Sequence, residues 1–281
     1  MQPSKVIMSE GSDRLSIVIR TFNSAKTIKR VLSFLHCEKY TEIIIVDSGS
    51  SDKTTEICSP YVTKVLRASQ PFHYSKALNI GFSHATGKWV LVISSHCIPT
   101  RAGFLENIFR FTQSADPGCV VGYGKLGVVA EQKTIPETIG NLHTFASGTF
   151  FPGGNGLAVY RRSAWTTHPF SEHIDTAEDL EWFLWAIRQG YTARFIQGAF
   201  AVYLNQGSLV HMFRKGWLEI RRTRVLLPDT RKRPFAILKA LVLRHAYYLW
   251  MALRLKISPA SFFRQLAHSF GAFFAEFFPL S

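Results

Sequence analysis

The sequence predicts an α/β fold with a largely parallel, doubly wound sheet flanked by helices. Two runs, IIIV at 43–46 and WVLVI at 89–93, are wholly apolar, as expected of strands covered on both faces. Segments with helical spacing separate the expected strands, and the links between them are short. Polar residues directly follow these strands, at the edge where such sheets bind their ligands.

The first hundred residues show this repetition at regular intervals. Strands are expected at 15–19, 43–46, 62–66 and 89–93, with helices at 25–35, just after 51, and at 75–85. In the first helix, Ile28, Val31 and Leu35 share one face. Beyond residue 100, a helix is expected at 103–112 and a strand at 119–122, whereas 124–150 follows no regular pattern.

The composition fits one large domain with an appended tail. The chain has 281 residues and is 47% hydrophobic, enough for a packed core, and we place the domain at 1–230 and the tail at 231–281. The four cysteines, at 37, 58, 97 and 119, form no paired metal motif and indicate buried thiols of a reducing compartment. The first residues lack the apolar core of an export signal, which favours a cytoplasmic location.

Asp47 is the first candidate for a binding residue. It ends the run EIIIVD, and its carboxylate would accept hydrogen bonds from a base or from ribose hydroxyls at the carboxyl edge of the sheet. The alternative is that Asp47 and Asp52 only turn the chain, as small polar residues often do. The pattern of residues alone leaves both interpretations open.

Glycine-loop nucleotide sites are disfavoured, because the chain contains neither GxGxxG after its first strand nor GxxxxGK[ST]. A glycine-rich turn does occur at Gly153-Gly154-Asn155-Gly156. Its glycines would let the backbone approach a ligand closely, or would only satisfy positive φ angles.

Asp179 is the second candidate, at the start of the expected helix AEDLEWFLWAI. Thr176 and Asp179 have the spacing of a capping box, and spacing alone favours this structural role. The functional alternative makes Asp179 a general base at the mouth of the sheet.

Five blocks of the sequence, taken together, resemble the family 2 glycosyltransferases of GT-A fold. They are VIRTFNSAKTI, EIIIVDSGSSDKT, KALNIGFSHATGKWVLVISSHCIP, GGNGLAVYRRSAW and AEDLEW, in that order. The resemblance extends roughly from Leu15 to Arg224, and the VDSGSSD form is most similar to bacterial members that build surface polysaccharides, rhamnosyltransferases among them. It implies an inverting transferase that moves a sugar from a nucleoside-diphosphate sugar to a hydroxyl of a glycan or lipid-linked acceptor.

The resemblance also assigns roles to individual positions. The implied donor-binding residues are Arg20, Thr21, Asn23, Asp47, Lys76, Asn79, Ser94 and Ser95. Among them, Thr21 and Asp47 would recognise the base, and Lys76 would approach the diphosphate. Asp179 would be the catalytic base, with Glu178 beside it.

The fourth strand departs from the family, whose Asp-x-Asp motif helps to hold a divalent ion against the donor. Ser94 and His96 stand at these positions, and Leu204 and Gln206 stand where relatives often place a further histidine. We expect a weakly bound divalent metal at His96, with Mn²⁺ preferred over Mg²⁺ because imidazole suits it better. Alternatively, His96 and Lys76 contact the phosphates directly, His96 in its protonated form.

The basic charge of the chain is concentrated in the tail. Residues 211–281 contain 13 Lys and Arg against 3 Asp and Glu, so they carry +10 of the net charge of +14. Lys239 and Arg244 interrupt the apolar stretch 235–253, which disfavours a membrane span and favours an amphipathic helix lying on anionic lipid. We expect peripheral attachment to the cytoplasmic face of the cell membrane, the alternative being a helical unit packed on the sheet.

Two other classes of function compete with an active transferase. A donor-binding protein that has lost catalysis would keep the fold, but it would have no need for the Glu178–Asp179 pair. Nucleic-acid binding is suggested by the net charge, but basic residues interleaved with long apolar segments fit lipid better than a phosphate-tracking groove.

Overall fold

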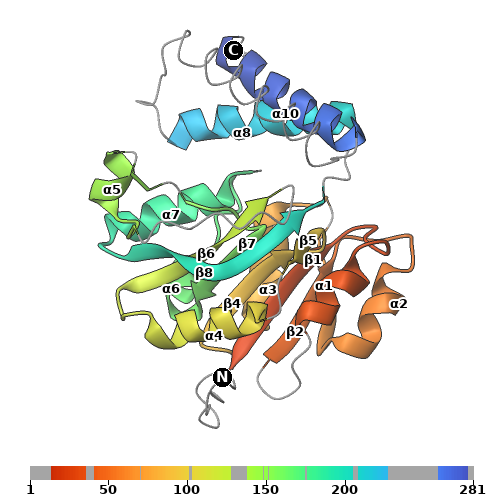
Figure 1. Ribbon diagram of the computed structural model, residues 1–281, viewed down its shortest axis with the longest axis horizontal. Coiled ribbons are helices and arrows are strands. Elements are labelled where there is room, and N and C mark those ends of the chain that lie inside the picture. The colour runs from red at the N-terminus through yellow and green to blue at the C-terminus, as the bar shows by residue number, and fades with distance from the viewer. Residues whose placement is uncertain are drawn as a thin grey trace.

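The computed structural model describes residues 14–35, 41–69, 71–100, 103–127, 138–147, 149–150, 152–174, 176–204, 208–226 and 259–277 (Figure 1). These residues form a mixed sheet with helices on both faces. The strands are β1 (Leu15–Thr21), β2 (Thr41–Asp47), β3 (Lys64–Arg67), β4 (Trp89–Ser94), β5 (Cys97–Pro99), β6 (Cys119–Gly127), β7 (Leu157–Arg161) and β8 (Thr192–Tyr203).

The helices alternate with the strands as the apolar spacing predicts. They are α1 (Ile28–Leu35), α2 (Thr54–Cys58), the 3₁₀ turn η1 (Ser59–Tyr61), α3 (Tyr74–Ser83), α4 (Phe104–Ser114), α5 (Leu142–Ala146), α6 (Arg162–Thr167), α7 (Glu178–Arg188), α8 (Leu209–Leu226) and α10 (Pro259–Phe277). The predicted helices at 25–35, 75–85 and 103–112 are confirmed with boundaries shifted by a few residues.

The sheet has the strand order β3-β2-β1-β4-β7-β6-β8-β5. The first four of these strands are parallel, which confirms the prediction for this half of the chain. In the other half, β7 runs antiparallel to both β4 and β6, and β5 runs antiparallel to β8. Because β7 is reversed, its beginning rather than its end lies at the carboxyl edge of β1 and β4.

Two apolar layers enclose the sheet. One joins alternate strand residues to α1 and α4, and the other joins the opposite strand faces to α3 and α7. Ile44, Ile45 and Val46 are completely buried, as expected for a strand covered on both faces. The described cysteines Cys58, Cys97 and Cys119 are free, buried thiols.

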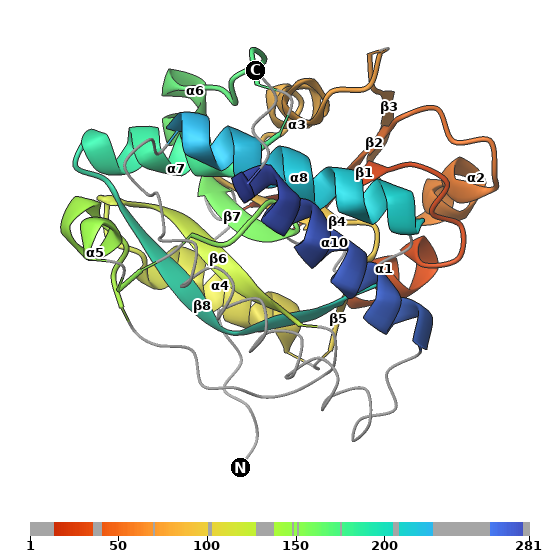
Figure 2. The ribbon, with the colours of Figure 1, turned by 90° about the horizontal axis from the view of Figure 1, so that it is seen from above.

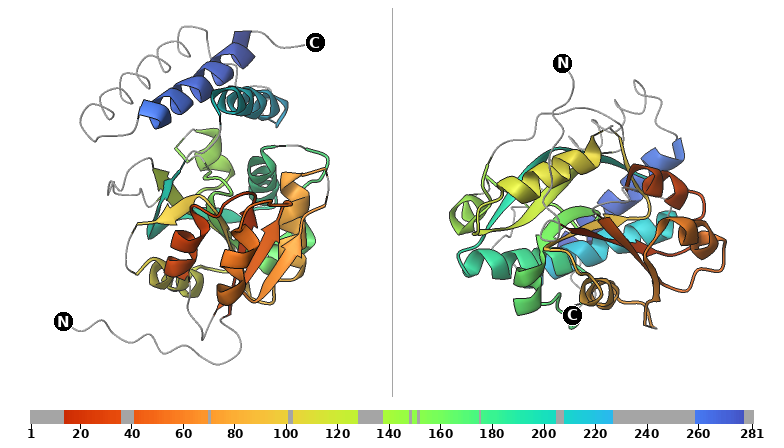
Figure 3. Two further views of the ribbon diagram at one scale, coloured as in Figure 1. Left: turned by 90° about the vertical axis from the view of Figure 1, so that its right-hand side faces the viewer. Right: turned by 90° about the horizontal axis from the view of Figure 1, so that it is seen from below.

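Helices α8 and α10 pack against each other in a separate layer beyond the carboxyl ends of β1 and β4 (Figures 1 and 2). The two helices cross closely at Gly216 and Gly271, where a Cβ atom would overlap the carbonyl oxygen of the opposite helix. The left view of Figure 3 shows the pair as a layer above the rest of the protein.

The tail predicted for membrane binding is only partly described. The apolar stretch 235–253 and the basic residues Arg231, Lys232 and Arg233 lie outside the described residues, whereas α10 lies within them. In the part of the chain that the structure describes, no helix is both long enough and apolar enough to cross a membrane.

Candidate active site

Three neighbouring strand ends form the floor of the candidate site. Thr21 at the end of β1 is paired in register with Asp47 at the end of β2, and Arg20 is paired with Ser94 at the end of β4. The parallel half of the sheet therefore brings the residues predicted from separate sequence blocks to a single edge.

Asp47 organises the turn that follows β2. Its Oδ1 accepts hydrogen bonds from the hydroxyls of Thr21 (2.8 Å) and Ser50 (2.6 Å), and its Oδ2 accepts from the backbone N–H groups of Gly49 (3.0 Å) and Ser50 (2.8 Å). These bonds use most of the acceptor sites of a carboxylate. The turn-forming role left open by the sequence is thus present, and recognition of a base by Asp47 stays a prediction.

Asn23 joins the loops after β1 and β2. Its side-chain oxygen accepts a hydrogen bond from the backbone N–H of Ser51 at 2.9 Å, and its own N–H donates to the Ser50 hydroxyl at 2.9 Å. Its φ of 46° lies in the left-handed region, which asparagine tolerates better than most residues. Asn23 and Asp47 therefore hold the two loops together.

We expect Asp47→Ala to weaken binding of a nucleoside diphosphate by about 10- to 100-fold, the equivalent of one charge-assisted hydrogen bond. The reason is that the hydroxyls of Thr21 and Ser50 lose the carboxylate that orients them. Calorimetry with UDP and GDP measures the affinity, and a thermal melt reports how much the turn itself contributes to folding. Unchanged affinity for both nucleotides would remove Asp47 from the donor site.

Asp179 lies in the first turn of α7, but not as part of a capping box. The residue before the helix is Ala177, with φ of 66°, and no side chain caps the helix. The predicted cap between Thr176 and Asp179 is therefore wrong, because the helix begins one residue too late for Thr176 to cap it. A non-glycine residue held at positive φ is costly, and such positions cluster at functional sites.

The Asp179 carboxylate is held by backbone donors. Oδ2 accepts a hydrogen bond from the N–H of Asn155 at 3.1 Å, and Oδ1 accepts one from the N–H of Leu180 at 2.8 Å. The backbone at Gly154 comes so close that a Cβ there would lie 3.0 Å from Oδ2. The glycine-rich turn before β7 thus approaches the carboxylate of Asp179.

Burial, followed by the charge of the adjacent Glu178 carboxylate, raises the pKa of Asp179 to about 7, whereas the N–H bonds from Asn155 and Leu180 oppose this rise. Glu219 of α8 adds a smaller rise. A carboxyl group that titrates near neutral pH is suited to accept a proton during a reaction.

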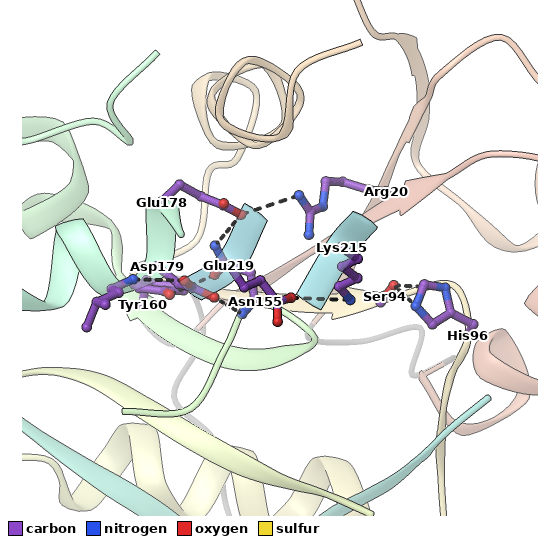
Figure 4. A network of polar contacts seen from close by, with 10 residues as sticks. Arg20, Ser94, His96, Asn155, Tyr160, Glu178, Asp179, Lys215 and Glu219 are labelled. Carbon is purple, nitrogen blue, oxygen red and sulfur yellow. Dashed lines mark hydrogen bonds and ion pairs between the residues drawn. The ribbon is translucent and has the colours of Figure 1, made fainter. Parts of the chain in front are cut away.

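Glu178 connects the start of α7 to β1 and β7. Its Oε1 accepts a hydrogen bond from the amide of Asn155 at 3.2 Å and lies 3.6 Å from Nη1 of Arg20. The Tyr160 hydroxyl in turn donates to the amide oxygen of Asn155 at 2.7 Å. Figure 4 shows these side chains converging with Asp179. Asn155 was predicted only as a turn residue, and its role in holding both carboxylates was missed.

At the end of β4, Ser94, Ser95 and His96 differ in their surroundings. Ser95 is buried, and its hydroxyl lies 2.8 Å from that of Ser24. The Ser94 hydroxyl lies 3.2 Å from the ring nitrogens of His96, whose ring packs edge-on against Tyr203 at 4.8 Å. Burial, followed by the charges of Lys215 and Arg20, lowers the pKa of His96 to about 4. The protonated form suggested for phosphate contact is therefore disfavoured at neutral pH.

Helix α8 contributes two charged side chains that the sequence analysis did not place in the site. Nζ of Lys215 lies 3.3 Å from the Tyr203 hydroxyl and 3.7 Å from Glu219, which is 2.9 Å from His268 of α10. Burial disfavours the Lys215 cation, but Tyr203 and Glu219 outweigh it and raise the pKa of Lys215 above its usual value. The only sequence signal was the basic character of the segment.

Lys76 and Asn79 lie on α3. Lys76 is exposed. The Asn79 amide donates to Phe170 O and to Glu172, each at 2.9 Å, and accepts from Trp165 Nε1 at 3.1 Å. These bonds tie α3 to α6 and to the segment after it, and the donor-binding roles of Lys76 and Asn79 stay predictions.

The side chains at the end of β4 do not fit a divalent ion. Ser94 and His96 offer a hydroxyl and an imidazole but no carboxylate, and the cations Arg20 and Lys215 stand close enough to depress the pKa of His96. In the part of the chain that the structure describes, no three His, Cys, Asp or Glu side chains are grouped so as to hold a metal ion. Hard cations require oxygen ligands and gain most from anionic ones.

Solved glycosyltransferases share this fold. The mannosyltransferase PcManGT of Pyrobaculum calidifontis, solved with GDP-Man and Mn²⁺, has a TM-score of 0.63 and 16% identity, covering 94% of this chain and 85% of that one. Glucosyl-3-phosphoglycerate synthase of Mycobacterium tuberculosis, solved with Mn²⁺, UDP and glucosyl-3-phosphoglycerate, has a TM-score of 0.59 and 16% identity, covering 76% and 79%. This likeness confirms the predicted GT-A fold. The Mn²⁺ in both neighbours is in line with the predicted divalent ion, although the side chains here do not provide for one.

The sequence comparisons also match glycosyltransferases. Glycosyltransferase GlyG of Streptococcus pneumoniae serotype 4 is 25% identical over 147 residues, which are 50% of this chain and 46% of GlyG. The match therefore spans about half of the length of this curated relative. The family model described as glycosyl transferase family 2 matches residues 16–155, which include the three strand ends but not Glu178 and Asp179. The rhamnosyltransferase-like branch stays a prediction, and at the level of the family, residues 16–155 match the model of glycosyl transferase family 2.

Proposed function

We propose that the protein is an inverting glycosyltransferase that moves a sugar from a nucleoside-diphosphate donor to a hydroxyl of a glycan or lipid-linked acceptor. The observation that carries the proposal is Asp179, whose pKa is raised to about 7 at the carboxyl edge of a family 2 sheet. The nucleoside would bind across the ends of β1 and β2, next to Thr21 and Asp47.

In the proposed reaction, one side of the site removes the acceptor proton and the other side binds the departing diphosphate. Asp179 takes the proton from the acceptor hydroxyl as its oxygen forms a bond to the anomeric carbon. The bond between that carbon and the diphosphate oxygen breaks on the opposite face, and its electron pair leaves with the diphosphate. Arg20 and Glu178, 3.6 Å apart, connect the donor side of the site to the base.

A panel of donors tests this proposal. Full-length protein is incubated with UDP-, GDP- and dTDP-sugars, with and without lipid-linked acceptors, and release of the nucleoside diphosphate is followed. We expect turnover with one donor class and stimulation by an acceptor. Binding of a donor without any release would instead support the second candidate, a nucleotide-sugar-binding protein that has lost catalysis.

Membrane attachment is the second part of the proposal. Its support is a group of exposed apolar residues on the C-terminal helices, Leu209, Val210, Val225, Phe263 and Phe270. Arg214 and Arg221 are exposed on the same helix α8. Apolar side chains beside basic ones are typical of helices that lie on anionic lipid.

We expect reversal of Arg231, Lys232 and Arg233 to Glu to release the protein from vesicles that contain anionic lipid. Each basic residue contributes about 1 kcal/mol near such a surface, and salt screens the attraction. Flotation with anionic and neutral vesicles at two salt concentrations measures the binding. Reversal of the exposed Lys26, Lys29 and Arg30 of the α1 region is the matched control and should leave binding unchanged. An equal loss of vesicle binding in both variants would show that the net charge of the protein, rather than the tail, causes the attraction.

This charge reversal is preferable to truncation. Deletion from Pro234 onward should also move the protein to the soluble fraction, but it would remove α10, which packs along α8. A truncated protein that still sedimented with membranes after a carbonate wash would place the attachment elsewhere.

A further inference from the structure

Two side-chain cations lie near the end of β4, where the divalent ion predicted at His96 would have to sit. Arg20 comes from β1 and Lys215 from α8, so they are 195 positions apart in the sequence. Figure 4 shows both side chains between the carboxylates of α7 and the Ser94–His96 pair. Together they supply the same formal charge as one divalent ion, at a strand end that offers no carboxylate to hold such an ion.

One nitrogen of the Arg20 guanidinium makes no hydrogen bond. Its Nη1 is buried and has no hydrogen-bond partner, although it lies 3.6 Å from Glu178. Its guanidinium lies over the ring of Tyr74, 4.9 Å from the ring centre, and this contact limits its orientation. A buried donor without a partner is costly, and an anionic ligand would satisfy it.

Lys215 is held beside the strand end by its neighbours. The Tyr203 hydroxyl accepts from Nζ at 3.3 Å, and the Tyr203 ring packs against the ring of His96 at 4.8 Å. Glu219 lies 3.7 Å from Nζ and is itself fixed by His268 at 2.9 Å. An ammonium group has three donors, so Lys215 keeps capacity for a ligand.

We propose that Arg20 and Lys215 bind the diphosphate of the donor and stabilise its charge as it leaves, in place of a divalent ion. The inference rests on the proposed function, because it assumes a nucleoside-diphosphate donor. It makes α8 a part of the active site, in addition to any role that this helix has at a membrane.

The test compares ligands with and without the diphosphate. Calorimetry on the full-length protein uses UDP, GDP and dTDP, each against its own nucleoside, in excess EDTA and then with Mn²⁺. We expect at least one diphosphate to bind in EDTA, more tightly than its nucleoside. The ratio of the two affinities, diphosphate over nucleoside, is the advantage that the diphosphate group confers. This advantage should fall by about 10- to 100-fold in Lys215→Met and in Arg20→Met, as expected for loss of a charge-assisted hydrogen bond.

Two variants separate this role from a structural one. Lys215→Arg keeps the cation and should retain most of the advantage, and Arg214→Met removes one exposed positive charge from the next position of α8 and should retain all of it. Thermal melts confirm that each variant is folded.

The outcomes distinguish failure of this inference from failure of the proposed function. Binding that disappears in EDTA and returns with Mn²⁺ would overturn the two-cation site and leave the transferase intact. An unchanged advantage in a folded Lys215→Met variant would overturn the role of Lys215. If none of the three diphosphates binds in either condition, the proposed function itself fails.

Discussion

Asp179→Asn is expected to lower the rate of sugar transfer by about 10²- to 10⁴-fold while donor binding stays nearly unchanged. The amide keeps the shape of the carboxyl group but cannot accept the proton of the acceptor hydroxyl, and loss of a general base has this magnitude. Transfer kinetics and calorimetry with the nucleoside diphosphate measure the two effects separately. A variant that keeps more than about a tenth of the parent rate would move the role to Glu178 or refute it.

The pH profile provides an independent check on the same residue. Asp179 must be deprotonated to act as a base, and its pKa is raised to about 7, so the rate should fall as the pH drops below that value. The groups that face it are Glu178 on α7, Glu219 on α8 and the buried Tyr123 and Tyr160 of the sheet. The small residual rate of Asp179→Asn should lose this dependence, whereas a variant that only disturbed the structure would keep it.

Gly271→Val is expected to separate α10 from α8 and to lower transfer by about 10²-fold. A Cβ at this position would overlap the carbonyl oxygen of Phe213, which is backbone and cannot move aside by a change of rotamer. Overpacking costs about 1–3 kcal/mol of stability, and small displacements of site residues cost much more in rate. The rate should fall because α8 carries Lys215 and Glu219.

Thermal melts and transfer rates measure this effect. Ala260→Val adds a branched side chain at an exposed position of the same helix and serves as the control. Gly216→Val should act like Gly271→Val, because a Cβ at 216 would overlap the carbonyl oxygen of His268 at the same crossing. The loss of stability in the double variant should be smaller than the sum of the losses in Gly216→Val and Gly271→Val, since the helices need to separate only once. Full additivity would show that the two glycines act independently.

The parallel half of the fold was predictable because its strands are buried on both faces. Such strands appear as continuous apolar runs, as at 43–46 and 89–93, and the helix faces at Ile28, Val31 and Leu35 follow a clear period. The reversed direction of β7 was not predictable. A buried strand has the same pattern of residues whichever way it runs, and only its pairing with β4 and β6 defines its direction.

The residues of the candidate site also include some that the sequence could place and others that it could not. Asp47 ends a recognisable strand and Asp179 lies at the start of a recognisable helix, so sequence reasoning could place them at the edge of the sheet. Asn155 and Lys215 could not be placed, because their partners Glu178, Asp179 and Tyr203 lie in other elements and are brought to them only by the fold. A count of basic residues describes Lys215 as one charge among many and does not show which of them faces the strand ends.

The reversed strand β7 also has a consequence for the order in which the protein acquires its parts during folding. Proteins are synthesised from the N-terminus, so elements can pair only in the order in which they are made. Strand β1 can pair with β2 and β4 once residue 94 has been made, whereas Trp89 can meet Arg161 only after β7 has been added. The edge that carries Thr21, Asp47 and Ser94 can therefore form before the turn that holds Asp179. A growing chain would have the proposed donor side of the site before it has the proposed base.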